Sequence, residues 1–241
     1  MGIPTRIPFA DLVTPHSELQ RELLAVFRAV LRRCTFIGGS IVEDFEREAA
    51  RHCGTRYCLG GSSGLDALRL VLTGAGVRPG DIVLTAPNAF TATMEAISRS
   101  KARPDFVDVD ERTYSLDWVR LERHRETRCY LDLVAGKLFD TKTQRPVTAV
   151  VPVHLCGQTA NMDPILEISE RYHLIVVEGA CQAHGAEYFS EKQNRWRKAG
   201  SIGRAAAFSF DPGANLGAFC YHGLLTPVVN RITIPYETFT G

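Results

Sequence analysis

The chain has 241 residues, of which 45% are hydrophobic and 23% are charged, a composition typical of water-soluble globular proteins. Its 28 lysine and arginine residues nearly balance 27 aspartate and glutamate residues, so the net charge of +1 disfavours nucleic acid and anionic membranes as partners. No apolar run reaches the roughly 18 residues that span a bilayer, and the N-terminus lacks the apolar segment of a signal peptide. We therefore expect a cytoplasmic protein.

The seven cysteines are scattered, odd in number and without a C-x-x-C pair. This pattern fits neither a disulfide framework nor a zinc site. We expect free thiols in a reducing compartment and no bound metal.

Helical periodicity alternates along the chain with short apolar runs bounded by turn residues. Runs such as AVVPV and LIVVE are apolar at consecutive positions, as in strands of a parallel sheet that is covered on both faces. The sequence therefore predicts an α/β layered fold. Helices are expected at 17–33, 41–53 (behind Ser40 as N-cap), 64–76, 91–102 and 163–173, and strands at 82–86, 105–110, 148–155, 174–180 and 205–210. Residues 111–146 show no readable period.

Residues 61–68, GSSGLDAL, form a loop of small residues that opens a predicted helix. Helix N-termini at the carboxyl edge of an α/β sheet bind anions, so a phosphate site is one interpretation. A tight loop that needs glycine for its backbone and serine as N-cap is an equally good one. Neither G-x-G-x-x-G nor a P-loop motif occurs, which disfavours a dinucleotide or P-loop nucleotide site.

Two further clusters follow predicted strands. Residues 176–187 end a strand in small residues and then offer Gln182 and His184, which we expect to face a site; for His184 a hydrogen-bonded turn is the simpler alternative. In residues 208–218, Ser209 ends a strand before a Pro-Gly turn. Its hydroxyl could bind an anion, although turn chemistry explains the segment equally well.

The order and spacing of these clusters resemble the DegT/StrS family, pyridoxal phosphate-dependent sugar aminotransferases of the aspartate aminotransferase fold. This resemblance implies a three-layer large domain with a mainly parallel central sheet at residues 1–219. It also implies that residues 220–241 are a divergent tail and that the family's smaller C-terminal domain is absent. We expect this tail to reflect an interrupted reading of the gene or a shortened sequence. The matching segments are 7–12, 38–68, 87–97, 151–165, 177–188 and 199–219.

The resemblance also implies roles for individual residues. The backbone of Gly64 and Leu65 and the hydroxyl of Ser209 match the family's phosphate cup. Phe90 matches the aromatic residue that stacks on the pyridine ring, and Gln182 matches the residue near the ring's phenolic oxygen. Two further motif positions, to which we assign no chemical role, are interpreted as structural: His154 and Asn161.

Three positions depart from the family's pattern. The lysine of P-G-K-N-L-G, which holds the cofactor covalently and moves the proton, is Ala214, and the aspartate at the pyridine nitrogen is Gly179. A threonine of the phosphate cup is Leu65. Glu178 is not expected to replace the missing carboxylate, because adjacent side chains on a strand point to opposite faces.

By descent, the resemblance implies a nucleotide-sugar aminotransferase of amino-sugar or polysaccharide biosynthesis, with glutamate as the amino donor and a homodimer in intact relatives. We expect this chain to bind pyridoxal phosphate or pyridoxamine phosphate without a covalent bond and to be catalytically impaired. Three alternatives stay open. They are a sugar dehydratase, disfavoured because alanine supplies no base; a non-catalytic protein that binds cofactor, nucleotide sugar or a full-length partner; and a degenerate gene product.

Overall fold

The computed structural model describes residues 11–213, 215, 218 and 222–227. The chain divides into two compact units, Met1–Asp44 and Phe45–Gly241, which we describe separately. The first unit contains α1 (Val13–Arg33), and α2 (Ser40–Cys53) crosses the boundary. Both predicted helices are confirmed, although Ser40 is the first residue of α2 rather than its N-cap. No helix among the described residues has the length and hydropathy to cross a bilayer.

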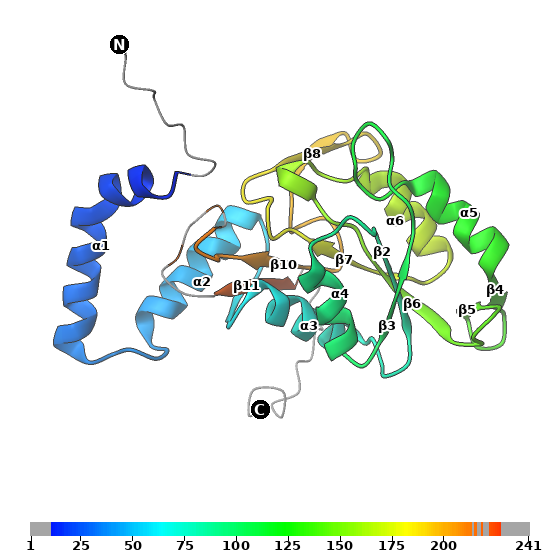
Figure 1. The fold of residues 1–241 in the computed structure, drawn as a ribbon, viewed down its shortest axis with the longest axis horizontal. Helices are drawn as coiled ribbons and strands as arrows, with labels where there is room; N and C mark the ends of the chain where they lie inside the picture. Colours follow the sequence, from blue (N-terminus) through cyan, green and yellow to red (C-terminus); the bar gives the residue numbers. More distant parts are fainter. Residues whose placement is uncertain (1–10, 214, 216–217, 219–221, 228–241) are drawn as a thin grey trace, which may run out of the picture. The chain divides into compact units, whose positions relative to one another are not determined.

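A mixed central sheet organises the second unit (Figure 1). Along the main path of the sheet the strands lie in the order β1 (Leu59–Gly61), β11 (Gly223–Pro227), β10 (Ala205–Ser209), β7 (Ile175–Gly179), β6 (Pro146–Val151), β2 (Ile82–Thr85) and β3 (Arg103–Phe106). Off this path, β4 (Cys129–Asp132) and β5 (Lys137–Asp140) join the sheet at β6, to which β5 is antiparallel. Neighbouring strands from β10 to β3 run parallel, and β11 runs antiparallel to β1 and β10. The predicted α/β fold with a mainly parallel sheet is therefore confirmed.

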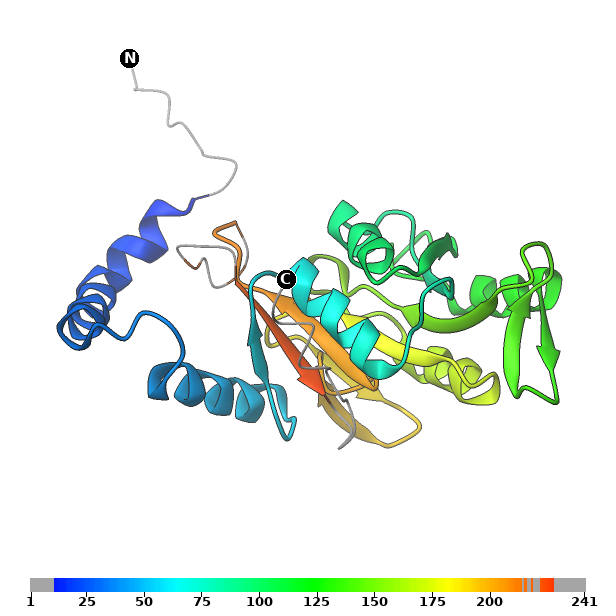
Figure 2. The ribbon, with the colours of Figure 1, turned by 90° about the horizontal axis from the view of Figure 1, so that it is seen from below.

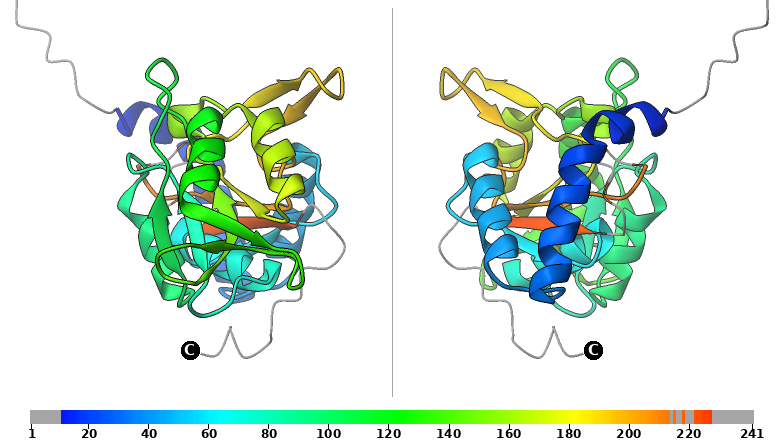
Figure 3. Two further views of the ribbon diagram at one scale, coloured as in Figure 1. Left: turned by 90° about the vertical axis from the view of Figure 1, so that its right-hand side faces the viewer. Right: turned by 90° about the vertical axis from the view of Figure 1, so that its left-hand side faces the viewer.

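Helices cover both faces of this sheet. One buried apolar cluster joins α3 (Gly64–Ala75) and α4 (Thr91–Arg99) to one face, and another joins α5 (Trp118–Arg128) and α6 (Met162–Arg171) to the other. Figure 2, seen from below, shows α3 on the near side of the strands, and Figure 3 (left) shows α3 and α6 on opposite sides of them. Figure 3 (left) shows α5 and α6 side by side. The arrangement is the three-layer architecture expected from the consecutive apolar residues of the strands.

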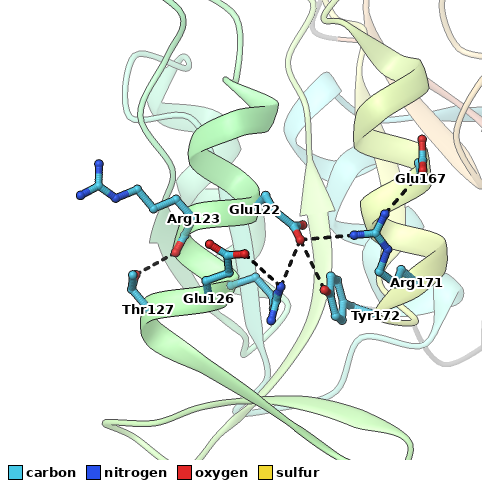
Figure 4. Close-up of polar contacts among 8 residues, drawn as sticks. Glu122, Arg123, Glu126, Thr127, Glu167, Arg171 and Tyr172 are labelled. Atoms are coloured by element: carbon cyan, nitrogen blue, oxygen red, sulfur yellow. Dashed lines mark hydrogen bonds and ion pairs between the residues drawn. The ribbon is translucent and has the colours of Figure 1, made fainter.

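The sequence did not predict the elements between residues 111 and 146. Helix α5 has few apolar residues, and its start is fixed by Asp117, whose carboxylate accepts from the Val119 amide at 2.8 Å. Polar contacts fasten α5 to α6: Oε1 of Glu122 accepts from Arg125, Arg171 and the Tyr172 hydroxyl at 3.1, 3.3 and 3.4 Å (Figure 4). Two hairpins were also not predicted: β4 (Cys129–Asp132) with β5 (Lys137–Asp140), and β8 (Glu187–Ser190) with β9 (Arg195–Lys198).

The expected end of the domain at residue 219 needs correction. Gly223–Pro227 forms β11 between β1 and β10, so this part of the supposed tail belongs to the central sheet. Gly223 also packs against the start of α3, where a Cβ would collide with the carbonyl group of Ser63. Two apolar residues of this strand, Leu224 and Leu225, are almost fully buried. Long-range pairing and burial, rather than a local pattern, place these residues in the domain.

Candidate functional site

A cavity of about 1480 Å³ lies where β7 and β10 end and α3 and α4 begin. It brings together residues that are far apart in the sequence, as expected at the carboxyl edge of a parallel sheet. Ala214 lies outside the described residues. All six of the other predicted site positions line this cavity: Gly64, Leu65, Phe90, Gly179, Gln182 and Ser209.

The start of α3 forms one wall of the cavity. Ser63 is the N-cap, and its hydroxyl accepts a hydrogen bond from the Asp66 amide at 3.0 Å. The amides of Gly64 and Leu65 belong to the first turn, where no intrahelical acceptor is available, and they lie at the positive end of the helix dipole. Both the serine-cap and the anion-site interpretations of this loop therefore fit the same geometry.

Ser209 approaches the start of α3 from the end of β10. A Cβ added to Gly64 would lie 2.7 Å from the Ser209 Cβ, 3.0 Å from the Cys181 sulfur and 3.1 Å from the Ser209 hydroxyl. Only glycine fits there. Cys181 also lines the cavity, and burial raises the pKa of its thiol to about 12, so this thiol is uncharged near neutral pH. We call Gly64, Leu65 and Ser209 the phosphate cup, after the family motif that these positions resemble in sequence.

Phe90 and Gln182 stand at the rim of the cavity. Phe90 directly precedes α4 and is 74% exposed, which leaves its ring free to contact a planar ligand. The side-chain oxygen of Gln182 accepts a hydrogen bond from the Cys156 backbone amide at 2.9 Å. The side-chain NH₂ group of Gln182 is therefore the donor that this residue can offer to a ligand. The Asn215 side chain donates to the Gln182 carbonyl at 3.4 Å.

Gly179 presents backbone alone to the cavity. Its amide donates to the Pro152 carbonyl at 2.9 Å, and its carbonyl accepts from the His154 amide at 3.0 Å. A Cβ at this position would lie 3.0 Å from a methyl carbon of Val153. Among the described lining residues there is no lysine, and the two acids are already engaged: Glu95 pairs with Arg99 and Asp211 accepts from Gly213.

Glu178 points away from the cavity, as the alternation of strand side chains predicts. It is fully buried and hydrogen-bonded to His154 at 3.0 Å. Glu178 therefore does not replace the missing carboxylate, and the structural interpretation of His154 agrees with this contact. Asn161 also makes a structural contact, because its side-chain oxygen accepts from the Tyr188 hydroxyl at 3.0 Å.

His184 packs between two aromatic rings, with centroids 5.2 Å from Phe208 and 5.4 Å from Phe210. Neither ring nitrogen has a hydrogen-bond partner among the residues that the structure describes. The backbone does form the hydrogen-bonded turn considered from the sequence, since the Ala183 amide donates to the Ala180 carbonyl at 2.9 Å, but the imidazole is not hydrogen-bonded within it. His184 also lines the cavity, as expected. Burial, with a smaller contribution from His52, lowers the pKa of His184 below its ordinary value.

The described part of the chain is a three-layer α/β domain with a cavity at the carboxyl edge of its sheet, beside the N-terminus of α3. The family model described as the DegT/DnrJ/EryC1/StrS aminotransferase family matches residues 17–227. The chain belongs to this family. The match includes β11, in agreement with the corrected domain boundary.

Individual relatives agree with this assignment. The chain is 37% identical over 214 residues to a dTDP-3-amino-3,4,6-trideoxy-alpha-D-glucose transaminase of Streptomyces venezuelae, covering 89% of this chain and 50% of the relative. It is 35% identical over 219 residues to a pleiotropic regulatory protein of Geobacillus stearothermophilus, covering 91% and 52%. The chain thus spans about half the length of these relatives.

Solved structures show the same fold. DesV of S. venezuelae, in complex with a ketimine intermediate, superposes with a TM-score of 0.79 at 35% identity, covering 93% of this chain and 54% of DesV. NtdA from Bacillus subtilis, with bound cofactor PMP, gives 0.78 at 26% identity, covering 95% and 46%.

Proposed function

We propose that this chain is the cofactor-binding domain of a nucleotide-sugar aminotransferase homologue that binds pyridoxal phosphate or pyridoxamine phosphate without a covalent bond. The observation that carries the proposal is the phosphate cup, in which the start of α3 and the end of β10 approach so closely that Gly64 has no room for a side chain. Relatives described as transaminases of dTDP-linked sugars, and a structural neighbour with bound PMP, support the same cofactor and substrate class.

The residues fit the phosphate and the ring of the cofactor. The first-turn amides of α3 and the Ser209 hydroxyl bind the phosphate, and the helix dipole adds to its attraction. Phe90 stacks on the pyridine ring, and the Gln182 side chain donates to the phenolic oxygen. These contacts orient a cofactor that, when bound, would supply amino-group transfer chemistry.

The site lacks two groups that transamination with this cofactor requires, a carboxylate at the pyridine nitrogen and a lysine amine. Gly179 offers no carboxylate to the pyridine nitrogen, and Ala214 has no amine for covalent attachment or proton transfer. We therefore propose that the chain is catalytically impaired and acts by binding. This consideration favours a non-catalytic cofactor- or nucleotide-sugar-binding protein over an active transaminase.

The cavity has room for more than the cofactor, and we propose that a nucleotide sugar occupies the remainder. Glutamate as amino donor, a homodimeric state and a cytoplasmic location are the corresponding proposals for partners and setting. They derive from the family to which the chain belongs.

A titration with pyridoxamine phosphate, compared with unphosphorylated pyridoxamine, tests the cup. Ser209→Ala removes a hydrogen bond to a charged phosphate, worth about 1.5–3 kcal/mol, and should weaken binding roughly tenfold to a hundredfold. Leu65→Thr adds a hydroxyl beside the same phosphate and should strengthen it. Ser115→Ala is the matched control, because the buried Ser115 hydroxyl has no partner among the described residues. Equal affinity for the two ligands would refute the proposal.

A further inference from the structure

The cavity offers little fixed positive charge to a phosphorylated ligand. A phosphate monoester carries about −1.5 to −2 charges near neutral pH, and a helix N-terminus offsets roughly half a charge. Among the lining residues that the structure describes, the one arginine, Arg99, is accompanied by two carboxylates, those of Glu95 and Asp211. Arg99 is also paired with Glu95 at 2.6 Å. The fixed charges of these residues therefore leave most of the phosphate's charge uncompensated.

His184 is the one described lining residue that can gain a positive charge near neutral pH. Its imidazole packs against Phe208 and Phe210, with ring centroids 5.2 and 5.4 Å away. These two residues precede and follow Ser209, whose hydroxyl belongs to the phosphate cup. His184 therefore lies against the end of β10 that carries the cup.

Both nitrogens of the His184 ring are unused. They are shielded from solvent and make no hydrogen bond within the described part of the chain. A neutral imidazole has one donor and one acceptor nitrogen, and buried polar atoms of folded proteins are normally hydrogen-bonded. An unused acceptor nitrogen on a ring that lines the cavity is a ready site for a proton when the charge in the cavity changes.

The protein's own groups keep His184 neutral near neutral pH. The β10 side of the ring is apolar, and His52 of α2 opposes a second positive charge. On the ring's own segment the Cys181 thiol is uncharged, and Asp211, which follows β10, accepts from the Gly213 amide instead. Burial and, to a smaller extent, His52 lower the pKa of His184 below its ordinary value. An additional negative charge is therefore needed to protonate the ring.

We propose that His184 takes up a proton from solvent when a phosphorylated ligand binds in the phosphate cup, so that the imidazolium balances part of the phosphate's charge. This inference rests on the proposed function and adds to it a residue that favours phosphorylated over unphosphorylated ligands. The proton passes from solvent to an unused ring nitrogen, and no bond of the ligand is made or broken. Because the bound anion raises the pKa of His184, the proton and the phosphate each strengthen the binding of the other.

Calorimetry with pyridoxamine phosphate measures this proton. The natural chain is titrated near neutral pH in buffers of different ionisation enthalpy, and the slope of the observed enthalpy against that enthalpy gives the number of protons taken up. We expect the natural chain to take up between about half a proton and one proton more than His184→Gln, which keeps a donor and an acceptor but does not titrate. Exposed His173→Asn is the matched control and should behave like the natural chain.

The dissociation constant should report the same coupling. Uptake of one proton tightens binding by up to about tenfold for each unit by which the pH falls. Between mildly alkaline and mildly acidic pH, pyridoxamine phosphate should therefore gain affinity more steeply for the natural chain than for His184→Gln. With unphosphorylated pyridoxamine the two chains should show the same pH profile, because the charge that protonates the ring is absent.

Two outcomes separate this inference from the proposed function. Equal proton uptake and parallel pH profiles in the natural chain and His184→Gln, with pyridoxamine phosphate still bound more tightly than pyridoxamine, would overturn the role of His184 and leave the phosphate cup unaffected. Equal affinity of the natural chain for the two ligands would overturn the phosphate cup and the role of His184 together.

A measurement on the natural chain covers the case in which His184→Gln does not fold. NMR of the chain with isotope-labelled histidine follows the titration of its seven histidines with and without pyridoxamine phosphate. The His184 resonance is assigned by its contacts with the rings of Phe208 and Phe210. We expect its titration midpoint to rise on binding. A His184 midpoint that bound pyridoxamine phosphate leaves unchanged would contradict the proposal.

Discussion

Nε2 of His154 lies 3.0 Å from Oε2 of Glu178, and both side chains are fully buried. The Ala160 amide donates to Nδ1 of the same imidazole at 3.1 Å, which assigns the proton to Nε2 and makes His154 a donor to Glu178. Three backbone amides of the loop before β10 also donate to the carboxylate, at 2.7–2.8 Å: those of Gly200, Ile202 and Gly203. This network fixes the end of β7, and with it the backbone of the neighbouring Gly179.

Glu178→Ala should strongly destabilise the domain, because it leaves a buried imidazole N–H and three backbone N–H groups without acceptors. We expect the free energy of unfolding to fall by about 3–5 kcal/mol, measured by urea denaturation. Glu187→Ala, at an exposed position on β8, is the control and should have little effect. A loss below about 1 kcal/mol for Glu178→Ala would contradict this account.

The contacts between α5 and α6 in Figure 4 allow a second stability test. Glu122→Ala removes the acceptor shared by Arg125, Arg171 and Tyr172, and we expect a loss of about 1–3 kcal/mol in unfolding free energy. Glu126 lies on the same helix but is 58% exposed and pairs with Arg125 only at 3.5 Å. Glu126→Ala should therefore cost about 0–1 kcal/mol. Equal losses in the two variants would be incompatible with the assigned role of Glu122.

Acid should destabilise the domain partly through His184. Burial lowers the pKa of His184 in the folded chain, so the unfolded chain binds the proton more readily. Its contribution to stability is complete above the ordinary histidine value of about 6.5 and is lost as the pH falls below it. His184→Phe should reduce the loss of thermal stability between neutral and mildly acidic pH. Exposed His173→Asn is the control. An unchanged pH profile in His184→Phe would count against burial as the cause.

Restoring a carboxylate at Gly179 should improve cofactor binding. Gly179→Asp adds a charge-assisted hydrogen bond to the pyridine nitrogen, worth about 1.5–3 kcal/mol, and should tighten pyridoxamine phosphate binding roughly tenfold to a hundredfold relative to Gly179→Asn. Both variants meet the same crowding at Val153, so their comparison isolates the charge. Matching dissociation constants for the two variants would show that the ring nitrogen does not face this position.

The sequence predicted the elements whose local pattern is strong. The helix that starts at Gly64 and the strands 82–86 and 174–180 were recognised because apolar runs and N-cap residues are local signals. α5 was not predicted, because only Leu121 and His124 are buried among its many charged residues. β11 was not predicted either, since its position depends on pairing with the preceding strand β10 and with β1, which lies far from it in the sequence.

The sequence could predict that six site positions lie together in one cavity. The order of the motifs and the topology of a parallel sheet place these positions at one edge of the sheet. The partners of Glu178 were not predicted. The presence of Glu178 at the end of the apolar run LIVVE did indicate that donors must lie nearby, since a buried carboxylate needs hydrogen-bond donors. Those donors come from His154 and from the loop before β10, and no local pattern identifies them.

The central claim, that the site holds its cofactor without a covalent bond, is tested most directly by borohydride reduction of the chain mixed with pyridoxal phosphate, followed by peptide mapping. Ala214→Lys is the positive control, because lysine at that position supplies the missing amine. We predict a stoichiometric label at residue 214 of this variant and no stoichiometric label on any lysine of the natural chain. A stoichiometric label on one lysine of the natural chain would contradict the account.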